Sequence, residues 1–238
     1  RVDACGLQCP GPILKMKKTM DSLVSGDRVE ITSTDPGFPR DAAAWCNSTG
    51  NQLISKETAG GKSVVVIEKG EPKSCNIVTS CEGKGKTFIM FSDDLDKALA
   101  TFVLANGAAA TGQKVTIFFT FWGLNVIKKL HKPNVEKDIF GKMFGMMLPS
   151  SSRKLKLSKM SMGGIGGKMM RYIMNRKGID SLESLRQQAL ENGVEFIACQ
   201  MSMDVMGVKQ EELLDEVTIG GVATYMERAD NANINLFI

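Results

Sequence analysis

The chain has 238 residues, 43% hydrophobic and 24% charged, with a net charge of +4. This composition is typical of a globular protein with room for two modest domains, and the charge alone does not indicate nucleic-acid binding. Six irregularly spaced cysteines exclude a disulfide-rich scaffold and favour a reducing compartment, so we predict a cytoplasmic protein. The start at Arg1, almost directly on a strand and without a signal peptide, leads us to expect a piece of a longer protein.

The first seventy residues have patterns in the order strand, helix, strand, helix, strand, strand (βαβαββ). We predict strands at 2–4 and 28–34, helices at 10–25 and 36–49, and a hairpin of 51–57 and 63–69. Two helices on one face of four strands make a small two-layer α/β sandwich. We therefore predict a first domain over 1–70 and a linker over 71–85, where proline and glycine lie among polar residues.

The remaining chain, 86–238, alternates strands with helices. We predict strands at 86–92, 114–121, 194–198 and 234–238, and helices at 95–110, 181–192 and 220–229. The apolar stretch 98–127 is interrupted by polar and glycine residues, so it predicts a helix and a strand rather than a membrane span. The pattern predicts a three-layer α/β/α domain with a mostly parallel sheet, whose ligand sites lie at the carboxyl ends of the strands.

Cys9 lies in the run Gly-Leu-Gln-Cys-Pro-Gly-Pro over 6–12, directly before a predicted helix. Pro10 suits the first helical position because its missing N–H would be unpaired there. Cys9 would then be the N-cap, where the positive end of the helix dipole favours a thiolate. Since Pro10 and Pro12 lack an N–H, the N–H groups of Gly11 and Ile13 are the candidates to face the sulfur. An ordinary buried cysteine is the alternative interpretation.

This run resembles the signature of the TusA/SirA family of small sulfur carriers, and the resemblance covers about 1–70. It implies that Cys9 carries a persulfide, supported by Pro10, Gly11 and Pro12. Many members of the family have a basic residue at the position of Gln8. Cys5 lies four residues before Cys9 and is a candidate to resolve a persulfide or disulfide there, which would make the domain a thiol–disulfide reductase.

Cys199 follows the predicted strand 194–198, in the run Phe-Ile-Ala-Cys-Gln-Met-Ser-Met. Together with 118–124 and 220–223, this segment resembles the DsrE-type, peroxiredoxin-like sulfur-relay family over about 86–238. The resemblance implies that Cys199 accepts or passes on a persulfide, whereas the residues alone leave open a buried core cysteine. Such chemistry requires no cofactor, and we predict no metal site because one histidine cannot complete the usual zinc sets.

A basic, methionine-rich insertion is expected over about 132–177. Residues 128–177 contain thirteen Lys and Arg against two acidic residues, and eight of the fifteen Met. We predict a substrate or partner surface there, formed by Lys168, Met169, Met170 and Arg171. Coenzyme A or a similar anionic thiol, a partner protein or an anionic membrane face would suit it, and an oligomer interface or a mobile flap are alternatives. Few aromatic residues and no binding motif argue against nucleic acid.

The function predicted from these features is that of a sulfurtransferase and sulfur carrier, working by persulfide relay through Cys9 and Cys199. The resemblance implies sulfur donor or acceptor partners, such as the rhodanese-like or flavin disulfide reductase modules that precede this pair of domains in larger fusions. We also expect homo-oligomers through the second domain. Two alternatives stay open: a thiol–disulfide reductase module using Cys5 and Cys9, and a non-catalytic interaction module of a larger flavoprotein disulfide reductase.

Overall fold

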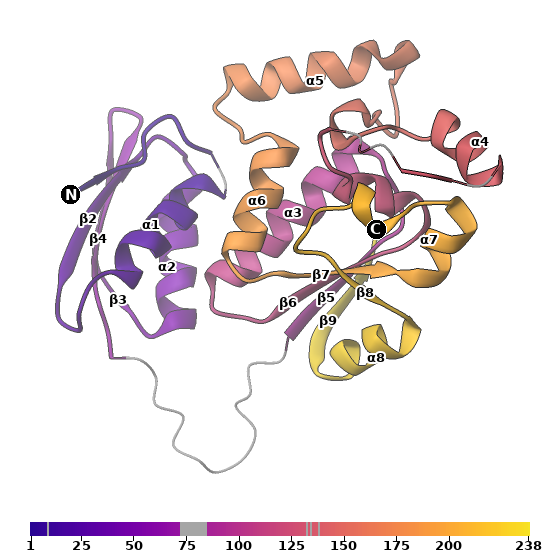
Figure 1. Ribbon diagram of the computed structural model, residues 1–238. Helices are drawn as coiled ribbons and strands as arrows, with labels where there is room; N and C mark the ends of the chain where they lie inside the picture. Colours follow the sequence, from indigo (N-terminus) through magenta and orange to yellow (C-terminus); the bar gives the residue numbers. More distant parts are fainter. Residues whose placement is uncertain (9, 72–84, 132, 134, 138) are drawn as a thin grey trace.

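The computed structural model describes residues 1–8, 10–71, 85–131, 133, 135–137 and 139–238. These residues form two units, each built around its own sheet (Figure 1). The predicted linker, 71–85, lies almost entirely outside the described residues.

The first unit is a four-stranded sheet with two helices on one face (Figure 1). Its elements are β1 (Val2–Asp3), α1 (Gly11–Asp21), β2 (Arg28–Ser33), α2 (Phe38–Thr49), β3 (Gln52–Ala59) and β4 (Lys62–Glu68). The strand order is β1-β2-β4-β3, with β1 parallel to β2 and the other neighbours antiparallel. Alternate residues of β2 and β4 are buried against the helices. In β2 they include Val29 and Ile31, whose alternation with polar residues predicts this strand. The two-layer sandwich is therefore confirmed.

Helix α1 is shorter at both ends than predicted. Pro10 is the N-cap rather than the first helical residue, and the helix ends at Asp21 instead of near residue 25. Its end is fixed locally, because the Ser22 hydroxyl donates to the Thr19 carbonyl oxygen at 2.7 Å. Gly26 then adopts a positive φ of 90°, which turns the chain into β2.

The second unit is a five-stranded sheet of order β8-β7-β6-β5-β9, in which every neighbouring pair is parallel. Its main elements are β5 (Gly85–Met90), α3 (Leu95–Ala110), β6 (Val115–Phe119), α6 (Leu182–Glu191), β7 (Glu195–Cys199), β8 (Thr218–Gly220), α8 (Val222–Asp230) and β9 (Ala232–Phe237). Helices α3 and α6 cover one face and α8 covers the other (Figure 1). This confirms the three-layer α/β/α architecture.

The helix predicted from residue 220 begins instead at Val222. Residues 218–220 form β8, because Gly220 pairs with Cys199 at the edge of the sheet. A three-residue strand leaves no periodicity in the sequence, so only its pairing with β7 identifies it.

The remaining elements are short or lie in the basic insertion. They are the 3-10 helices η1 (Phe121–Ile127), η2 (Ser152–Lys154), η3 (Met162–Gly164) and η4 (Gln210–Glu212), and the α-helices α4 (Ile139–Met147), α5 (Ile165–Arg176) and α7 (Gln200–Met206). Helices α4, α5 and α7 were not predicted from the sequence. Among the described residues, no helix is both long enough and apolar enough to cross a membrane.

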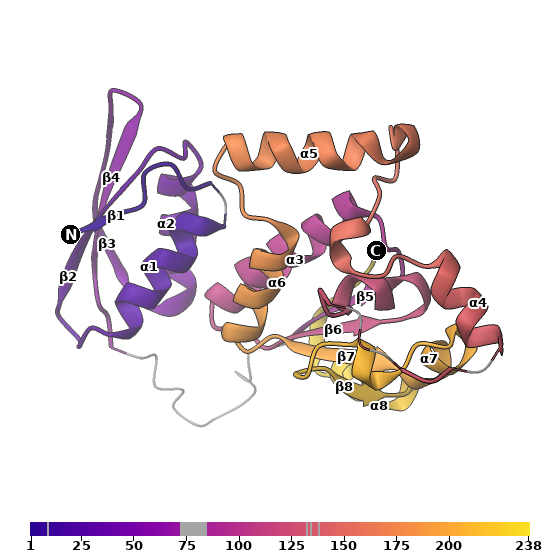
Figure 2. The same ribbon diagram turned by 45° about the horizontal axis from the view of Figure 1, so that its top comes forward.

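The two units are in contact, with α1 lying against α3, and two close approaches show how they meet. The indole Nε1 of buried Trp45 donates a hydrogen bond to the carbonyl oxygen of Ala110, at the end of α3. Gly178, just after α5, approaches Gly6 so closely that a Cβ at Gly178 would lie 2.1 Å from the Gly6 carbonyl oxygen. Helices α1 and α2 accordingly lie beside α3 and α6 in both views (Figure 1 and Figure 2).

Candidate functional site

The loop between β1 and α1 contains the first predicted site, although Cys9 itself lies outside the described residues. The Cys5 N–H donates to Asp3 Oδ1 at 2.8 Å, and the Gly6 N–H donates to Thr34 Oγ1 at 2.9 Å. Gly6 has a φ of 79°, a conformation that favours glycine. The loop is therefore held against the end of β2 up to Gly6.

The start of α1 differs from expectation at Gly11. Its N–H, one of the two candidates to face the sulfur of Cys9, donates to the Gln8 carbonyl oxygen at 2.8 Å. This donor is therefore used before the helix begins. Pro10, Gly11 and Pro12 are all buried, and a Cβ at Gly11 would lie 3.2 Å from Leu7 Cβ.

Cys5 is partly exposed, and its environment disfavours the thiolate. A hydrogen bond to the Asp3 carboxylate raises the pKa of the Cys5 thiol, with desolvation adding to the effect. The same hydrogen bond lowers the pKa of Asp3. Since the thiolate is the attacking form, Cys5 is a weak nucleophile near neutral pH.

Cys199 is the last residue of β7 and is only 6% exposed. Side chains alternate along a strand, so Phe196 and Ala198 pack under α3 and α6, while Ile197 and Cys199 face the opposite side. There Cys199 belongs to a small cluster that includes Tyr225 of α8. The thiol thus lies on the α8 face of the sheet, at the edge where α/β folds bind ligands.

Exposed apolar side chains follow the strand ends at this edge. Trp122 follows β6, Met201 follows β7 and Val222 follows β8, and all three are exposed. Just after β6 and β7, the hydroxyl oxygens of Thr120 and Ser202 lie 2.8 Å apart in a buried hydrogen bond. The edge around Cys199 therefore presents exposed apolar side chains together with the exposed polar residues Gln200 and Asp204.

The two predicted thiol sites do not meet in this structure. Gly6 contacts Gly178 on the side of α3 and α6, whereas Cys199 faces α8 across the sheet (Figure 1). A helix with its side chains is about 10 Å across. At least one helix layer and the sheet therefore separate the loop at Gly6 from the thiol of Cys199.

The predicted surface on α5 is divided between two faces of the helix. Lys168 and Met169 are exposed, but Met170 packs against the main core. Arg171 is half-buried, its Nη2 donates to the Ser152 carbonyl oxygen at 3.0 Å, and burial lowers its pKa. Met170 and Arg171 thus attach α5 to the second unit.

The outward apolar residues of α5 are Ile165, Met169, Tyr172 and Ile173, between 40% and 65% exposed. Of these, only Met169 belongs to the surface predicted from the sequence. Their spacing of four, three and one residues is that of one helix face. This periodicity was the signal that could have revealed both the helix and its surface.

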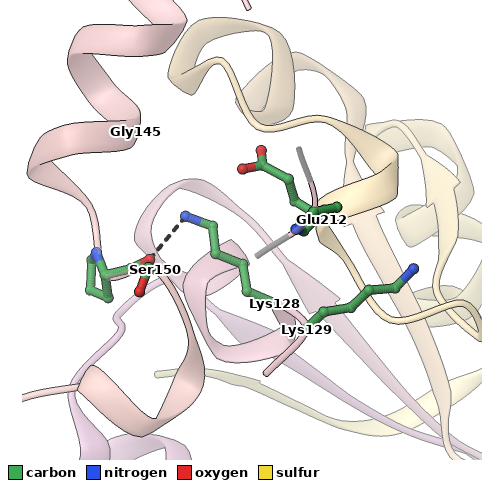
Figure 3. Close-up of a pocket in the computed structure, with 7 residues that line it drawn as sticks. Lys128, Lys129, Gly145, Ser150 and Glu212 are labelled. Carbon is green, nitrogen blue, oxygen red and sulfur yellow. Dashed lines mark hydrogen bonds between the residues drawn. The ribbon is translucent and has the colours of Figure 1, made fainter. Parts of the chain in front are cut away.

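A narrow hollow with a volume of about 10 Å³ lies between the insertion and η4 (Figure 3). Lys128 Nζ donates to the Pro149 carbonyl oxygen at 3.2 Å, and buried Glu212 pairs with Lys137 at 2.5 Å. Lys129 points away and pairs with Asp215 at 2.7 Å (Figure 3). These charged side chains are thus paired within the protein. The volume of the hollow is below that of sites for drug-sized ligands, so the hollow gives no support to coenzyme A binding.

No group of three or more His, Cys, Asp or Glu that could hold a metal ion occurs within the part of the chain that the structure describes. The three free cysteines described are Cys5, Cys46 and Cys199. Cys46 is a core residue, and burial raises its pKa to about 11.

Comparison with known proteins matches both units. The model of the DsrE/DsrF/DrsH-like family matches residues 83–237, and that of sulfurtransferase TusA matches 1–69. The protein YrkE of Bacillus subtilis is 44% identical over 155 residues, which are 65% of this chain and 97% of YrkE. Sulfur carrier protein DsrE2 of Allochromatium vinosum is 38% identical over 161 residues, 66% of this chain and 99% of DsrE2.

The first unit has its own relative in the same organism. Sulfur carrier protein TusA of Allochromatium vinosum is 43% identical over 68 residues, which are 29% of this chain and 90% of TusA. The chain thus belongs to the DsrE/DsrF/DrsH-like family and contains, in residues 1–69, a TusA sulfurtransferase domain fused to its DsrE-like domain.

Proposed function

We propose that this protein carries and transfers sulfane sulfur as a persulfide, through Cys9 in the first domain and Cys199 in the second. The observation that carries this proposal is that both parts of one chain are similar to proteins named sulfur carriers, TusA and DsrE2. We propose 1–70 and 86–238 as the two functional domains, acting with sulfur donor and acceptor proteins in a reducing, cytoplasmic setting.

The proposed chemistry is an exchange between thiolates. The thiolate of the accepting cysteine attacks the outer sulfur of the donor persulfide. A new S–S bond forms, the old one breaks, and the donor cysteine leaves as a thiolate. The transferred sulfur keeps its proton, so the step needs neither an oxidant nor a reductant.

The surroundings of Cys199 support a role as a protected carrier. The thiol is nearly buried at the carboxyl end of β7, in a cluster with Phe118, Ile197 and Tyr225. Exclusion of water limits side reactions of a reactive group such as a persulfide. Transfer then requires neighbouring side chains to move when a partner docks.

The alternative of a thiol–disulfide reductase using Cys5 and Cys9 has weaker support. Because Asp3 raises the pKa of Cys5, little thiolate is present there to attack a neighbouring sulfur. A relay through Cys199 needs no contribution from Cys5.

The test is mass spectrometry of the whole chain after incubation with a persulfide donor. We expect a gain of about 32 Da, one sulfur atom, on peptides containing Cys9 and Cys199. Cys9→Ser and Cys199→Ser should each remove one adduct, whereas Cys46→Ser should remove neither. Absence of adducts on both cysteines, while Cys5 reacts, would overturn the proposal and favour the reductase or a non-catalytic module.

A further inference from the structure

The outward face of α5 is an exposed apolar stripe formed by Ile165, Met169, Tyr172 and Ile173. Residues spaced three and four apart lie on the same face of a helix, so these four side chains form one continuous row. Exposed apolar patches of this kind mark interaction surfaces.

The opposite face of α5 packs closely against the rest of the second unit. A Cβ at Gly166 would lie 2.1 Å from the Met160 carbonyl oxygen, so the helix lies directly on the preceding loop. Met174 is buried, and Arg171 is bonded to the Ser152 carbonyl oxygen. A surface formed before binding loses little conformational entropy when a partner docks.

The charges beside the stripe indicate an acidic partner. Lys168, Arg176 and Lys177 are exposed on α5 or directly after it. Residues 159–177 contain five basic residues and no acidic residue. The complementary surface therefore has an apolar centre and negative charges at its rim.

Helix α7 of this same protein has such a surface, with apolar side chains beside negative charges. Met201 and Val205 are 54% and 56% exposed, and Asp204 is exposed between them. Glu211 adds an exposed negative charge shortly after the helix. The whole segment 178–238 contains eleven acidic residues against three basic ones.

Within one chain, α5 and α7 lie apart in both views (Figure 1 and Figure 2). Each of these helices nevertheless lies next to one of the two cysteine sites. Helix α7 begins directly after Cys199, and Gly178 at the end of α5 contacts Gly6, three residues before Cys9 in the sequence. The α7 of another copy, docked on this stripe with its first turn towards Gly178, would therefore bring its Cys199 towards the loop that precedes Cys9.

We propose that a second copy of this chain docks its α7 on the outward face of α5, so that sulfur passes between Cys199 of one copy and Cys9 of the next. This inference rests on the proposed persulfide function and uses the same exchange step. The two surfaces differ, so the contact is head-to-tail. One short helix face is smaller than the roughly 800 Å² per partner of stable interfaces, so the contact depends on protein concentration.

The test mixes two full-length variants. A Cys9→Ser chain is loaded with sulfur from inorganic polysulfide, freed of excess donor, and mixed with a nitrogen-15-labelled Cys199→Ser chain. We expect the labelled chain to gain about 32 Da on Cys9, at a rate that rises with protein concentration. If sulfur passes from Cys199 to Cys9 in the native chain but not between the two mixed variants, docking between copies is overturned. The proposed persulfide function would be unaffected by that result. Failure to load Cys199 at all would overturn both.

Charge reversal separates docking from random collision. Lys168→Glu in the accepting chain should slow transfer about tenfold, which corresponds to about 1.4 kcal/mol. Asp204→Lys in the loaded chain should restore much of the rate. Lys142→Glu makes the same charge change at an exposed position of α4 and should leave the rate unchanged.

A membrane is the competing occupant of this surface. If α5 instead serves an anionic membrane, Lys168→Glu would abolish binding to phosphatidylglycerol vesicles while transfer between copies stays unaltered. That result would overturn the proposal.

Discussion

The indole of Trp45 donates a hydrogen bond to the carbonyl oxygen of Ala110, which is the last residue of α3. These residues are 65 positions apart and belong to different units, and both are buried. The contact places the TusA-like domain against the helix layer of the DsrE-like domain. It therefore fixes the carrier domain on the face of the sheet opposite to that of Cys199.

Trp45→Phe should weaken this contact. Phenylalanine keeps most of the apolar volume but has no donor, so the Ala110 carbonyl loses its partner in a buried position. We expect a loss of about 1–3 kcal/mol in the free energy of unfolding, measured by urea denaturation and circular dichroism. Trp122→Phe is the matched control, because Trp122 is 43% exposed, and it should change stability by less than about 0.5 kcal/mol. Equal effects of both substitutions would contradict a specific role for Trp45.

Gly178→Ala tests the second contact between the units. Gly178 has a φ of 66°, and a Cβ there would meet the Gly6 carbonyl oxygen at 2.1 Å. Gly193→Ala is the control, since Gly193 has a φ of 77° but open space around its Cβ position. Each substitution lowers the free energy of unfolding by about 1–2 kcal/mol, because alanine is disfavoured in the left-handed conformation. We expect the Gly178 variant alone to lose further stability and to expose Cys5 to faster alkylation, and equal stability losses would argue against the contact.

The sequence predicts those elements whose residues form a regular pattern. The alternation at Val29 and Ile31 predicts β2, and the apolar run ending at Ala198 predicts β7 to within a residue. The short β8 was missed because its identity depends on pairing with β7. Helix α5 was missed because the glycines at its start are typical of loops, although Gly166 lies within the helix, where it allows close packing.

The candidate site was only partly predictable for a related reason. The run before Cys199 indicates a strand end, but the face to which the thiol points depends on which helices cover each side of the sheet. The contact of Gly6 with Gly178 joins residues far apart in the chain. The Gly11 N–H, one candidate donor to the sulfur, is instead used by the Gln8 carbonyl oxygen, a pairing that the sequence pattern did not indicate.

Asp3→Asn should make Cys5 more reactive. The Asp3 carboxylate raises the pKa of the Cys5 thiol through a hydrogen bond, and asparagine removes the negative charge. We expect the pKa of Cys5 to fall towards its ordinary value, seen as a shift to lower pH in its alkylation profile measured by peptide mass spectrometry. Asp27→Asn, in a turn after α1, should leave the profile unchanged. An unaltered profile in the Asp3 variant would show that another group controls this thiol.

The buried thiol of Cys46 should make the free energy of unfolding depend on pH in alkaline solution. Burial raises its pKa in the folded protein from 9.0 to about 11, so the unfolded chain loses this proton first as the pH rises. The contribution of the protonated thiol is complete below about pH 9 and is lost progressively as the pH rises to about 11. Cys46→Ala removes the titrating group while the other cysteines remain. Urea denaturation between pH 8 and pH 11 should therefore give a steeper loss of stability for the native chain than for the variant. Parallel curves would mean that the Cys46 thiol is ionised equally easily in the folded and unfolded states, which its burial against Trp45 and Ala42 argues against.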